Sequence, residues 1–351
     1  MFCPPSHRNL LCQTIAYDVC VFGAGPAGTA AAIRLAAKGL SVVLLERPMQ
    51  MKPWGGESFT GAIRTPLETL GCWEQFERAN HRCAYERQSA WGSEPLVESS
   101  IFRMDGPTWH VDREKFDDDL RSAALARGIP LISYHGLNGI TRESDSWFVA
   151  LDEEFRIRAA YLVDATGRSR ALARRLRAKI EFHDQLIGLC NAVPHRENGV
   201  EIQSMMLEAT SFGWWYAAPT PNGHVVAILT DSDLAPAELR RRFRTVAANS
   251  ALTYMDAFDG WLPVGDACAS HDPLCGWGVY RALTNGILAA DAIFAFLASG
   301  ATTQLENYRD HCYRQYDRYL TGLTERYSIE RRWPTAPFWQ WRHRPVSHAS
   351  G

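Results

Sequence analysis

The sequence has few lysines, no closely paired cysteines and no long uninterrupted apolar run. The nine cysteines are scattered and form no C-x-x-C pair, which argues against a disulfide framework and against a structural zinc site. We therefore expect no bound metal. Among the 37 basic residues 33 are arginine, and the lysines are Lys38, Lys52, Lys115 and Lys179.

The longest apolar stretch, Ile287–Ala298, contains Asp291 and is too short to span a bilayer. The first thirty residues lack a basic segment followed by a clean apolar core, so we expect no signal peptide. The net charge of -2 gives no bulk attraction to nucleic acid or anionic membranes. These features predict a cytoplasmic protein without a membrane span or a nucleic-acid partner.

With 351 residues, 46% hydrophobic and 22% charged, the chain is long enough for about two globular domains. Residues 18–22 and 41–45 read as buried strands on either side of an alanine-rich helix, Thr29–Lys38. Asp112 can cap a helix over 113–127, and a strand at 131–133 follows. Apolar runs at 147–151 and 155–159 flank an acidic turn and predict a hairpin that leads into a strand at 161–163.

The pattern then changes to strand-like runs at 187–192, 202–208, 213–218 and 224–230, with Asn222-Gly223 as a hairpin turn between the last two. These runs predict an antiparallel sheet. After it, the α/β pattern returns with a strand at 261–264 and a long helix at 279–298. The predicted fold class is α/β, with a three-layer Rossmann-like domain, an inserted antiparallel substrate domain and a helical C-terminal tail. The expected bounds are 1–80, 107–178 and 259–300 for the first domain, 81–106 and 179–258 for the second, and 301–351 for the tail.

A glycine motif, G-x-G-x-x-G, stands between the first strand and the first helix. Without Cβ atoms the backbone can turn tightly and approach a pyrophosphate, which the helix N-terminus stabilises through its free N–H groups and its dipole. Glu46 ends the second strand, where an acidic side chain can bind ribose hydroxyls. This arrangement predicts a dinucleotide site formed by Gly23, Gly25, Pro26, Ala27, Gly28, Glu46 and Arg47.

A Gly265-Asp266 pair ends the strand at 261–264, and Asp272-Pro-Leu-Cys-Gly276-Trp-Gly278 precedes the long helix. Here the chain resembles FAD-dependent oxidoreductases of the glutathione-reductase type, in the branch of aromatic hydroxylases, flavin halogenases and geranylgeranyl reductases. The resemblance implies non-covalent FAD, with Asp266 on the ribityl chain. It also implies that the amides of Gly276, Trp277 and Gly278 face the flavin pyrimidine, where a helix N-terminus suits negative charge on a reduced flavin. Asp266 as a plain helix cap is the alternative.

Two further segments agree with this resemblance. Val163-Asp-Ala165-Thr166-Gly167-Arg168 resembles the second strand-end motif of these flavoproteins, beside the pyrophosphate, although it could be a simple turn. Trp109-His-Val-Asp112-Arg113 resembles the segment whose arginine reaches the FAD phosphates; an exposed arginine in a first helical turn is the alternative. The predicted cofactor residues therefore also include Arg113, Ala165, Thr166, Gly167 and Gly265.

Candidates for a catalytic role are His271, Pro273 and Glu57. His271 could face the flavin or be a loop histidine satisfied by the backbone. Glu57, in Gly55-Gly56-Glu57-Ser58, matches a family loop near the flavin but could cap the following helix. Of Trp214, Trp215 and Tyr216, at least one should pack in the core and one could line a substrate pocket. Cys268 and Cys275 flank the flavin loop, but buried thiols need no chemistry to explain them.

The stretches 212–219, 246–253 and 272–274 resemble those of one subgroup. Its members include flavin monooxygenases that hydroxylate a tryptophan within a partner protein during maturation of quinone cofactors. The resemblance thus implies monooxygenation of an aromatic ring through a flavin C4a-hydroperoxide, with NAD(P)H or an external reductant as electron donor. The substrate would be an indole, free or as a tryptophan of a partner protein. The C-terminal tail is a candidate rim for such a partner, or it packs onto the FAD domain; its Arg/Trp-rich residues are Arg331, Arg332, Trp333, Trp339, Trp341 and Arg342.

Three rival functions stay open. Flavin halogenases use a lysine to direct hypohalous acid and carry a W-x-W-x-I-P segment, and neither a matching lysine nor that segment is found. A flavin reductase of the geranylgeranyl-reductase type shares the FAD motifs. A catalytically idle flavoprotein acting as a scaffold or redox sensor is a third alternative, and substrate-stimulated NAD(P)H consumption would separate it from an enzyme.

Overall fold

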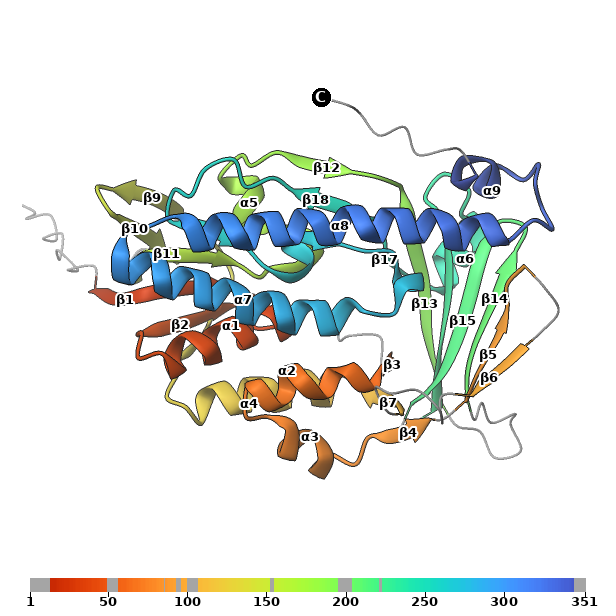
Figure 1. The fold of residues 1–351 in the computed structure, drawn as a ribbon, viewed down its shortest axis with the longest axis horizontal. Helices are drawn as coiled ribbons and strands as arrows, with labels where there is room; N and C mark the ends of the chain where they lie inside the picture. Colours follow the sequence, from red (N-terminus) through yellow and green to blue (C-terminus); the bar gives the residue numbers. More distant parts are fainter. Residues whose placement is uncertain are drawn as a thin grey trace, which may run out of the picture.

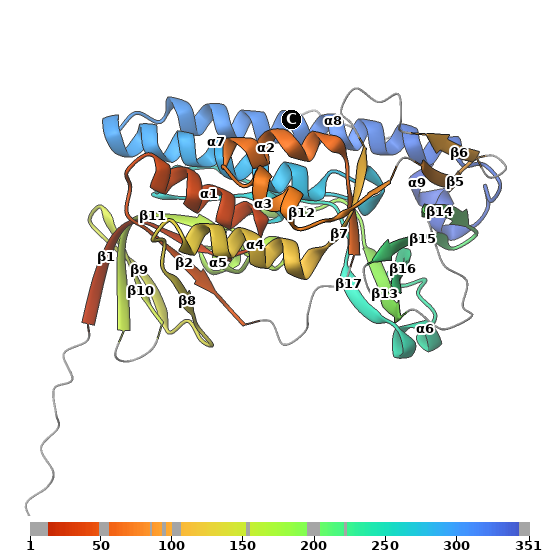
Figure 2. The ribbon, with the colours of Figure 1, turned by 90° about the horizontal axis from the view of Figure 1, so that it is seen from below.

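The computed structural model describes residues 13–48, 56–84, 86–92, 96–99, 107–151, 155–194, 204–220 and 223–343. The predicted α/β class is confirmed: a layered part with a mostly parallel sheet and long helices is joined to an antiparallel sheet at one end of the molecule (Figure 1). The two longest helices run side by side over the layered part, and the longer one continues to the antiparallel sheet, as both views show (Figure 2).

The parallel strands lie in the order β8-β2-β1-β11, and β19 pairs with the second half of β11. Their bounds are Gln13–Phe22 (β1), Val42–Glu46 (β2), Leu131–Ser133 (β8), Phe155–Asp164 (β11) and Trp261–Pro263 (β19). The first half of β11 pairs instead with the antiparallel hairpin of β10 (Ser146–Ala150) and β9 (Gly139–Glu143). The predicted strands at 155–159 and 161–163 are thus one continuous strand with two different neighbours.

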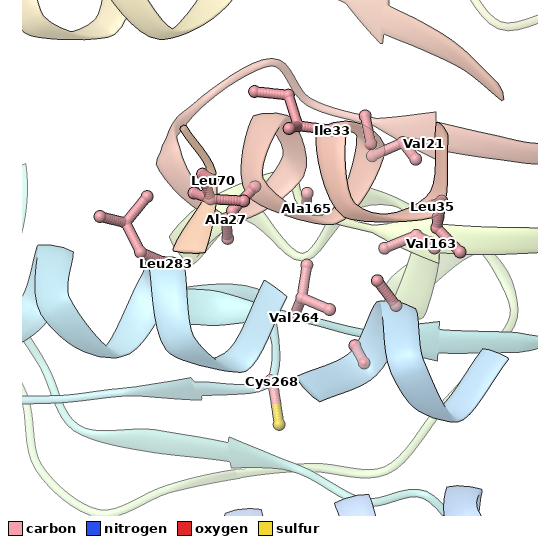
Figure 3. Packing of buried hydrophobic residues seen from close by; sticks show 14 of the residues in the cluster. Val21, Ala27, Ile33, Leu35, Leu70, Val163, Ala165, Val264, Cys268 and Leu283 are labelled. Atoms are coloured by element: carbon pink, nitrogen blue, oxygen red, sulfur yellow. The ribbon is translucent and has the colours of Figure 1, made fainter. Parts of the chain in front are cut away.

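Both faces of the parallel sheet are buried, which is why its strands read as unbroken apolar runs. Val19 and Val21 face the helical layer, whereas Cys20 and Phe22 pack against the β9–β10 hairpin on the other side. The helical layer consists of α1 (Pro26–Ala37), α4 (Arg113–Leu125) and α7 (Gly278–Ser299). Figure 3 shows α1 packed between the sheet and α7. The Asp112 cap is confirmed, since its carboxylate accepts from the Lys115 amide at 3.1 Å.

The antiparallel sheet has the order β17-β13-β16-β15-β14-β5-β6. Its strands are Glu86–Ala90 (β5), Leu96–Ser99 (β6), Leu186–Pro194 (β13), Met205–Thr210 (β14), Gly213–Thr220 (β15), Gly223–Asp231 (β16) and Arg244–Ala247 (β17). The hairpin of β15 and β16 is confirmed. Of the predicted turn residues, Gly223 instead pairs with Thr220 in the ladder, and Asn222 lies outside the described residues.

Two small sheets connect these parts. One has the order β3-β7-β4 (Gly56–Phe59, Thr108–Asp112, Arg82–Ala84), and the other β12-β18-β20 (Ile180–Phe182, Ala251–Thr253, Ala269–Ser270). Because β20 belongs to the predicted first domain and β12 and β18 to the second, that border runs through a sheet. The short helices are Arg64–Thr69 (α2), Trp73–Arg78 (α3), Ala171–Arg175 (α5) and Ala237–Arg242 (α6).

The C-terminal tail consists of α8 (Thr303–Ile329) and α9 (Pro337–Arg342). The first half of α8 packs against α7 in the main core, whereas Tyr327 and the α9 residues Phe338 and Trp339 belong to the core of the antiparallel sheet. The tail therefore bridges both parts. By length and composition α7 is apolar enough to cross a membrane, with a mean hydropathy of 1.5, but here it is a core helix between α1 and α8.

Candidate functional site

The three glycines of the G-x-G-x-x-G motif differ in whether the surrounding packing leaves room for a Cβ atom. A Cβ at Gly23 would lie 2.3 Å from the carbonyl oxygen of Ala165, and one at Gly28 would lie 1.9 Å from that of Gly23. A Cβ at Gly25 would meet no atom within 4 Å, and Gly25 has an ordinary extended backbone (φ -79, ψ -176). Packing therefore requires Gly23 and Gly28 but does not require Gly25, so the space over Gly25 fits a cofactor.

That space lies at the N-terminus of α1, where Pro26 occupies the first turn. A helix leaves the amides of its first turn without intrahelical acceptors, here those of Ala27 and Gly28. No acidic side chain lies in this first turn, so nothing on the helix itself neutralises its positive end. The arrangement fits a pyrophosphate, as the sequence predicted.

Glu46 lies at the carboxyl end of β2, half-buried, where the nucleotide ribose was predicted. Its carboxylate pairs with Arg121 of α4 at 3.3 Å, a contact that the motif did not reveal. The pair places the carboxylate next to the helical layer, although the Arg121 Nε has no hydrogen-bond partner in the described part of the chain. The neighbouring Arg47 is exposed.

The second strand-end motif, after β11, is built around a buried carboxylate. Asp164 accepts from the amide and hydroxyl of Thr166 at 3.0 and 2.6 Å and from the Ala173 amide at 2.8 Å. Burial raises the pKa of Asp164 although these hydrogen bonds lower it. The amide of Ala165 donates to Phe22 at the end of β1, which holds this turn, with Gly167 following, beside the glycine motif.

Asp266 lies in a short 3-10 turn, Gly265–Ala267, directly after β19. It is not the N-cap residue of that turn, which is Val264, but lies within its first turn. A Cβ at Gly265 would lie 2.7 Å from that of Ala27, so this turn is packed against the start of α1. Asp266 is about one-third exposed and pairs with Arg168 at 3.3 Å. Its carboxylate is therefore held close to the pyrophosphate end of the predicted site.

The turn before α7 is open on one side. Gly276 has φ +65, which favours glycine, and a Cβ on Gly276 or Gly278 would meet no atom within 4 Å. Trp277 is the N-cap residue of α7, and its carbonyl accepts from the Arg281 amide at 3.0 Å. Of the three predicted amides, that of Gly276 already donates to the Pro273 carbonyl at 3.0 Å. The amides at the start of the 22-residue helix border open space, which fits the predicted contact with the flavin pyrimidine.

Arg113 is not an exposed arginine of a first helical turn, so that alternative is wrong. Its guanidinium binds Glu57 of β3 and, at 3.2 Å, Asp117 one helical turn ahead. Burial alone would lower the pKa of Arg113, but the two carboxylates raise it above its ordinary value. Glu57 is paired in a strand and caps no helix, so that reading of Glu57 is wrong too. The preceding Gly55 lies outside the described residues.

His271 is buried, and the ring of Tyr319 lies 4.3 Å from its ring centre. Burial first, and then nearby arginines, hold its pKa well below the usual value, so the imidazole is neutral. Its carbonyl accepts from Arg168 at 2.6 Å. The buried Nε2 of His271 has no hydrogen-bond partner among the described residues, and a catalytic role stays a prediction. Pro273 opens a 3-10 turn that Asp272 caps through the Leu274 amide at 2.9 Å.

The aromatic residues of β15 divide as the alternation of a strand requires. Trp214 is 1% exposed and belongs to the core, as predicted for at least one of the three. Trp215 is partly exposed and its indole donates to Glu208 at 3.1 Å. β15 lies against β3 and β7, which carry Glu57 and His110.

The structure buries two of the six residues of the predicted partner rim and leaves the others accessible, and a partner contact there stays a prediction. Arg331, Arg332 and Trp341 are exposed, and Trp333 is half-buried. Trp339 is fully buried, and Arg342 is 6% exposed and paired with Asp231 at 2.8 Å. The alternative, packing onto the FAD domain, is wrong, because α9 packs onto the antiparallel sheet. Trp341, with 39% exposure, remains at the surface.

The cysteines and the remaining surface show no second reactive centre in the described chain. A hydrogen bond to Cys312 and burial raise the pKa of Cys268, and burial raises that of Cys275, so neither thiol is activated. In the part of the chain that the structure describes, no group of three His, Cys, Asp or Glu side chains could hold a metal ion.

A cavity of about 670 Å³ lies between Tyr134, Leu151 and Phe155, which pack on the hairpin face of the sheet, away from α1.

Two arginines that sequence reasoning did not single out organise this region. Arg168 joins Asp266 to the carbonyls of Asn249 and His271, both at 2.6 Å. Arg170 is 1% exposed with φ +48, and it donates to Ser270 and Thr253 of the small connecting sheet. The only signal for them was their position within and just after the motif at 163–168. The partners of Arg168 lie 81 and 103 residues further along the chain, and those of Arg170 lie 83 and 100 residues further.

Comparisons with known proteins agree with this geometry. Residues 18–182 match the family model "FAD dependent oxidoreductase". The chain is 30% identical to the FAD-dependent oxidoreductase LodB of Marinomonas mediterranea, over 95% of this chain and 99% of that protein. It is also 30% identical to a 1H-pyrrole-2-carbonyl-[peptidyl-carrier protein] brominase of Pseudoalteromonas luteoviolacea, over 79% of this chain and 77% of that one.

Solved structures share the fold at lower identity. The flavin-dependent halogenase CmlS superposes with a TM-score of 0.81 at 20% identity, over 95% of this chain and 68% of that one. The peptidyl tryptophan dihydroxylase QhpG superposes with a TM-score of 0.75 at 20% identity, over 93% and 79%.

Proposed function

The chain belongs to the family of FAD-dependent oxidoreductases, and from that premise we propose that it is a monooxygenase that hydroxylates an aromatic ring, an indole in the first place. Bound FAD supplies the redox chemistry, taking electrons from NAD(P)H or an external reductant and activating dioxygen. The protein's part is to bind the cofactor, hold the ring, exclude water and stabilise negative charge.

We assign each of these roles to a set of residues. The space over Gly25 and the first turn of α1 receive the pyrophosphate, and Asp266 holds the ribityl chain. The amides at the start of α7 stabilise the reduced isoalloxazine. The aromatic strand β15, packed against β3 and β7, forms the dry side on which an aromatic substrate would lie.

The positions of the lysines are the observation that favours hydroxylation over halogenation. Lys38 pairs with Asp291 and Lys115 with Asp119, at 2.9 and 3.0 Å. The ammonium of Lys179 lies 4.3 Å from the ring centre of Tyr254. Each of these three lysines is thus engaged with a residue outside the predicted flavin site, whereas halogenases need a lysine there; Lys52 lies outside the described residues.

Halogenation is the second candidate, because one relative of 30% identity is a brominase. The finer proposal, a tryptophan within a partner protein, is supported by the shared fold with a peptidyl tryptophan dihydroxylase and by the motifs at 212–219 and 272–274. On this proposal the partner protein presents its indole at the β15 side of the site.

One experiment separates the candidates. The FAD-loaded enzyme is reduced and exposed to heavy-isotope oxygen gas, with bromide present, and given free indoles or tryptophan-containing peptides. We expect products that carry one or two labelled oxygen atoms by mass spectrometry. Bromine in the product would establish halogenation instead, and a gain of two hydrogens without oxygen would establish a reductase.

A further inference from the structure

The C-terminal helix α8 is bonded to the loops that carry the predicted flavin contacts. The hydroxyl of Tyr308 donates to the carbonyl of Pro263, at the end of β19, at 2.9 Å. The hydroxyl of Tyr319 accepts from the backbone amide of Asp272 at 2.6 Å, and that of Tyr327 donates to the Asp272 carboxylate at 2.7 Å. The helix thus contacts this part of the site through fixed hydroxyl groups, from the side opposite to the sheet.

Asp272 is the residue on which two of these bonds converge. It is 1% exposed, one carboxylate oxygen accepts from the Leu274 amide, and the other accepts from Tyr327. Among the described residues no lysine or arginine lies within ion-pair distance of it. A buried carboxylate held by hydrogen bonds alone depends strongly on each of them. Burial raises the pKa of Asp272 to about 6.

The hydrogen-bond chain continues into the antiparallel sheet. The indole N–H of Trp214, in β15, donates to the Tyr327 hydroxyl at 3.0 Å. Trp214 and Tyr327 are both fully buried, so water does not replace this bond. A continuous chain therefore runs from Trp214 through Tyr327 and Asp272 to the Leu274 amide. It connects the sheet that carries the aromatic residues to the turn that precedes α7.

The far end of this chain is where backbone position matters most for a flavin. Leu274 lies in the turn Pro273–Cys275, which leads through Gly276 to the first amides of α7. A Cβ at Gly276 or Gly278 would meet no protein atom within 4 Å, so packing does little to restrain these two residues. The hydrogen bonds to Asp272 anchor the turn from behind, together with the packing of Leu274 and Cys275 against the two cores.

We propose that Tyr327 is a positioning residue of the FAD site, which places the turn before α7 against the flavin and couples that placement to the packing of Trp214 in the antiparallel sheet. The proposal rests on FAD binding at this turn and not on which reaction follows. Its readouts therefore need neither substrate nor oxygen, and it can fail or stand independently of hydroxylation.

The test compares Tyr327→Phe with Tyr313→Phe in the FAD-loaded, full-length protein. Both variants remove one hydroxyl from α8; that of Tyr313 accepts from the Met255 amide at 2.6 Å, outside the predicted flavin turn. Tyr327→Phe should weaken FAD binding about tenfold. It should also move the flavin midpoint potential and visible circular dichroism. It should lower the melting temperature of the apo protein more than Tyr313→Phe does, because two buried groups, the Asp272 carboxylate and the Trp214 indole, lose their partner. Tyr313→Phe should leave potential and spectrum unchanged.

An unchanged potential in Tyr327→Phe, or an equal shift in both variants, would overturn the proposal. Should Tyr327→Phe fail to fold, Trp214→Phe probes the same chain from its other end, because it removes the donor and keeps a large ring. We then expect a smaller shift of the potential in Trp214→Phe, and no shift there would equally overturn the proposal.

Discussion

Replacing Gly25 by valine should abolish FAD binding while leaving the fold intact. The backbone of Gly25 is extended, a region that valine prefers, and its added side chain would meet no protein atom within 4 Å of the Cβ. Loss of glycine's conformational freedom in the unfolded chain stabilises by roughly 0.4–1 kcal/mol, and the poorer helix N-cap costs a similar amount. The free energy of unfolding should thus change by less than about 1 kcal/mol.

The effect on the cofactor should be much larger. A branched side chain in the space over Gly25 holds the pyrophosphate away from the first amides of α1. Losing two hydrogen bonds to a charged group costs roughly 3–6 kcal/mol, which is about 10²- to 10⁴-fold in Kd. By contrast, valine at Gly28 would place its Cβ 1.9 Å from the Gly23 carbonyl and should prevent folding.

The assay pairs thermal unfolding of the apo protein with titration of FAD followed by fluorescence, for Gly25→Val, Gly28→Val and the surface control Gly322→Val. Gly322 lies on α8, is exposed and has no neighbour within 4 Å of an added Cβ. Only Gly25→Val should be folded and unable to bind FAD. Stoichiometric FAD in Gly25→Val, or unfolding of Gly25→Val like that of Gly28→Val, would refute the placement of the pyrophosphate.

Two further predictions concern single side chains. Asp266→Ala should weaken FAD binding about 10- to 100-fold, measured by fluorescence titration. The melting temperature should change little, because Asp266 is about one-third exposed and Arg168 keeps its two carbonyl partners. Unchanged affinity would contradict the role of Asp266 in FAD binding. His110, hydrogen-bonded to Ser58, has a pKa that burial lowers to about 4, so it stays neutral in the fold while the unfolded chain takes up a proton below about 6.5. Its contribution to stability is complete above pH 6.5 and is lost as the pH falls toward 4, about 3 kcal/mol in all. Urea unfolding at pH 7 and 4.5 should therefore show a smaller loss for His110→Gln than for the parent, and equal losses would speak against a buried neutral His110.

Local signals predicted the elements near the FAD site well. Unbroken apolar runs gave the parallel strands because both sheet faces are buried, and Asp112 marked the start of α4 by the capping rule. The glycine motif was recognisable because its requirement is local, involving one strand, one turn and one helix.

The partners of the charged residues were not predictable in the same way. Arg168 reaches Asn249 and His271, 81 and 103 residues away, and no periodicity encodes such pairings. The burial of Trp339 and Arg342 was missed for the same reason, since a surface helix rich in arginine and tryptophan looks alike whether it docks a partner or its own sheet. Whether these side chains are buried depends on packing of the tail against the antiparallel sheet, which lies far away in the sequence.

Among the described residues, charge pairing engages the three acidic side chains placed around the predicted cofactor. Glu46, Glu57 and Asp266 are bound by Arg121, Arg113 and Arg168, respectively. Such partly exposed pairs contribute little to stability, so their effect is to fix where each carboxylate points. A guanidinium does this better than an ammonium, because its planar fork can hold a carboxylate and a backbone carbonyl together, as that of Arg168 does. The site then works through oriented carboxylates and helix amides, and the hard chemistry is left to the cofactor.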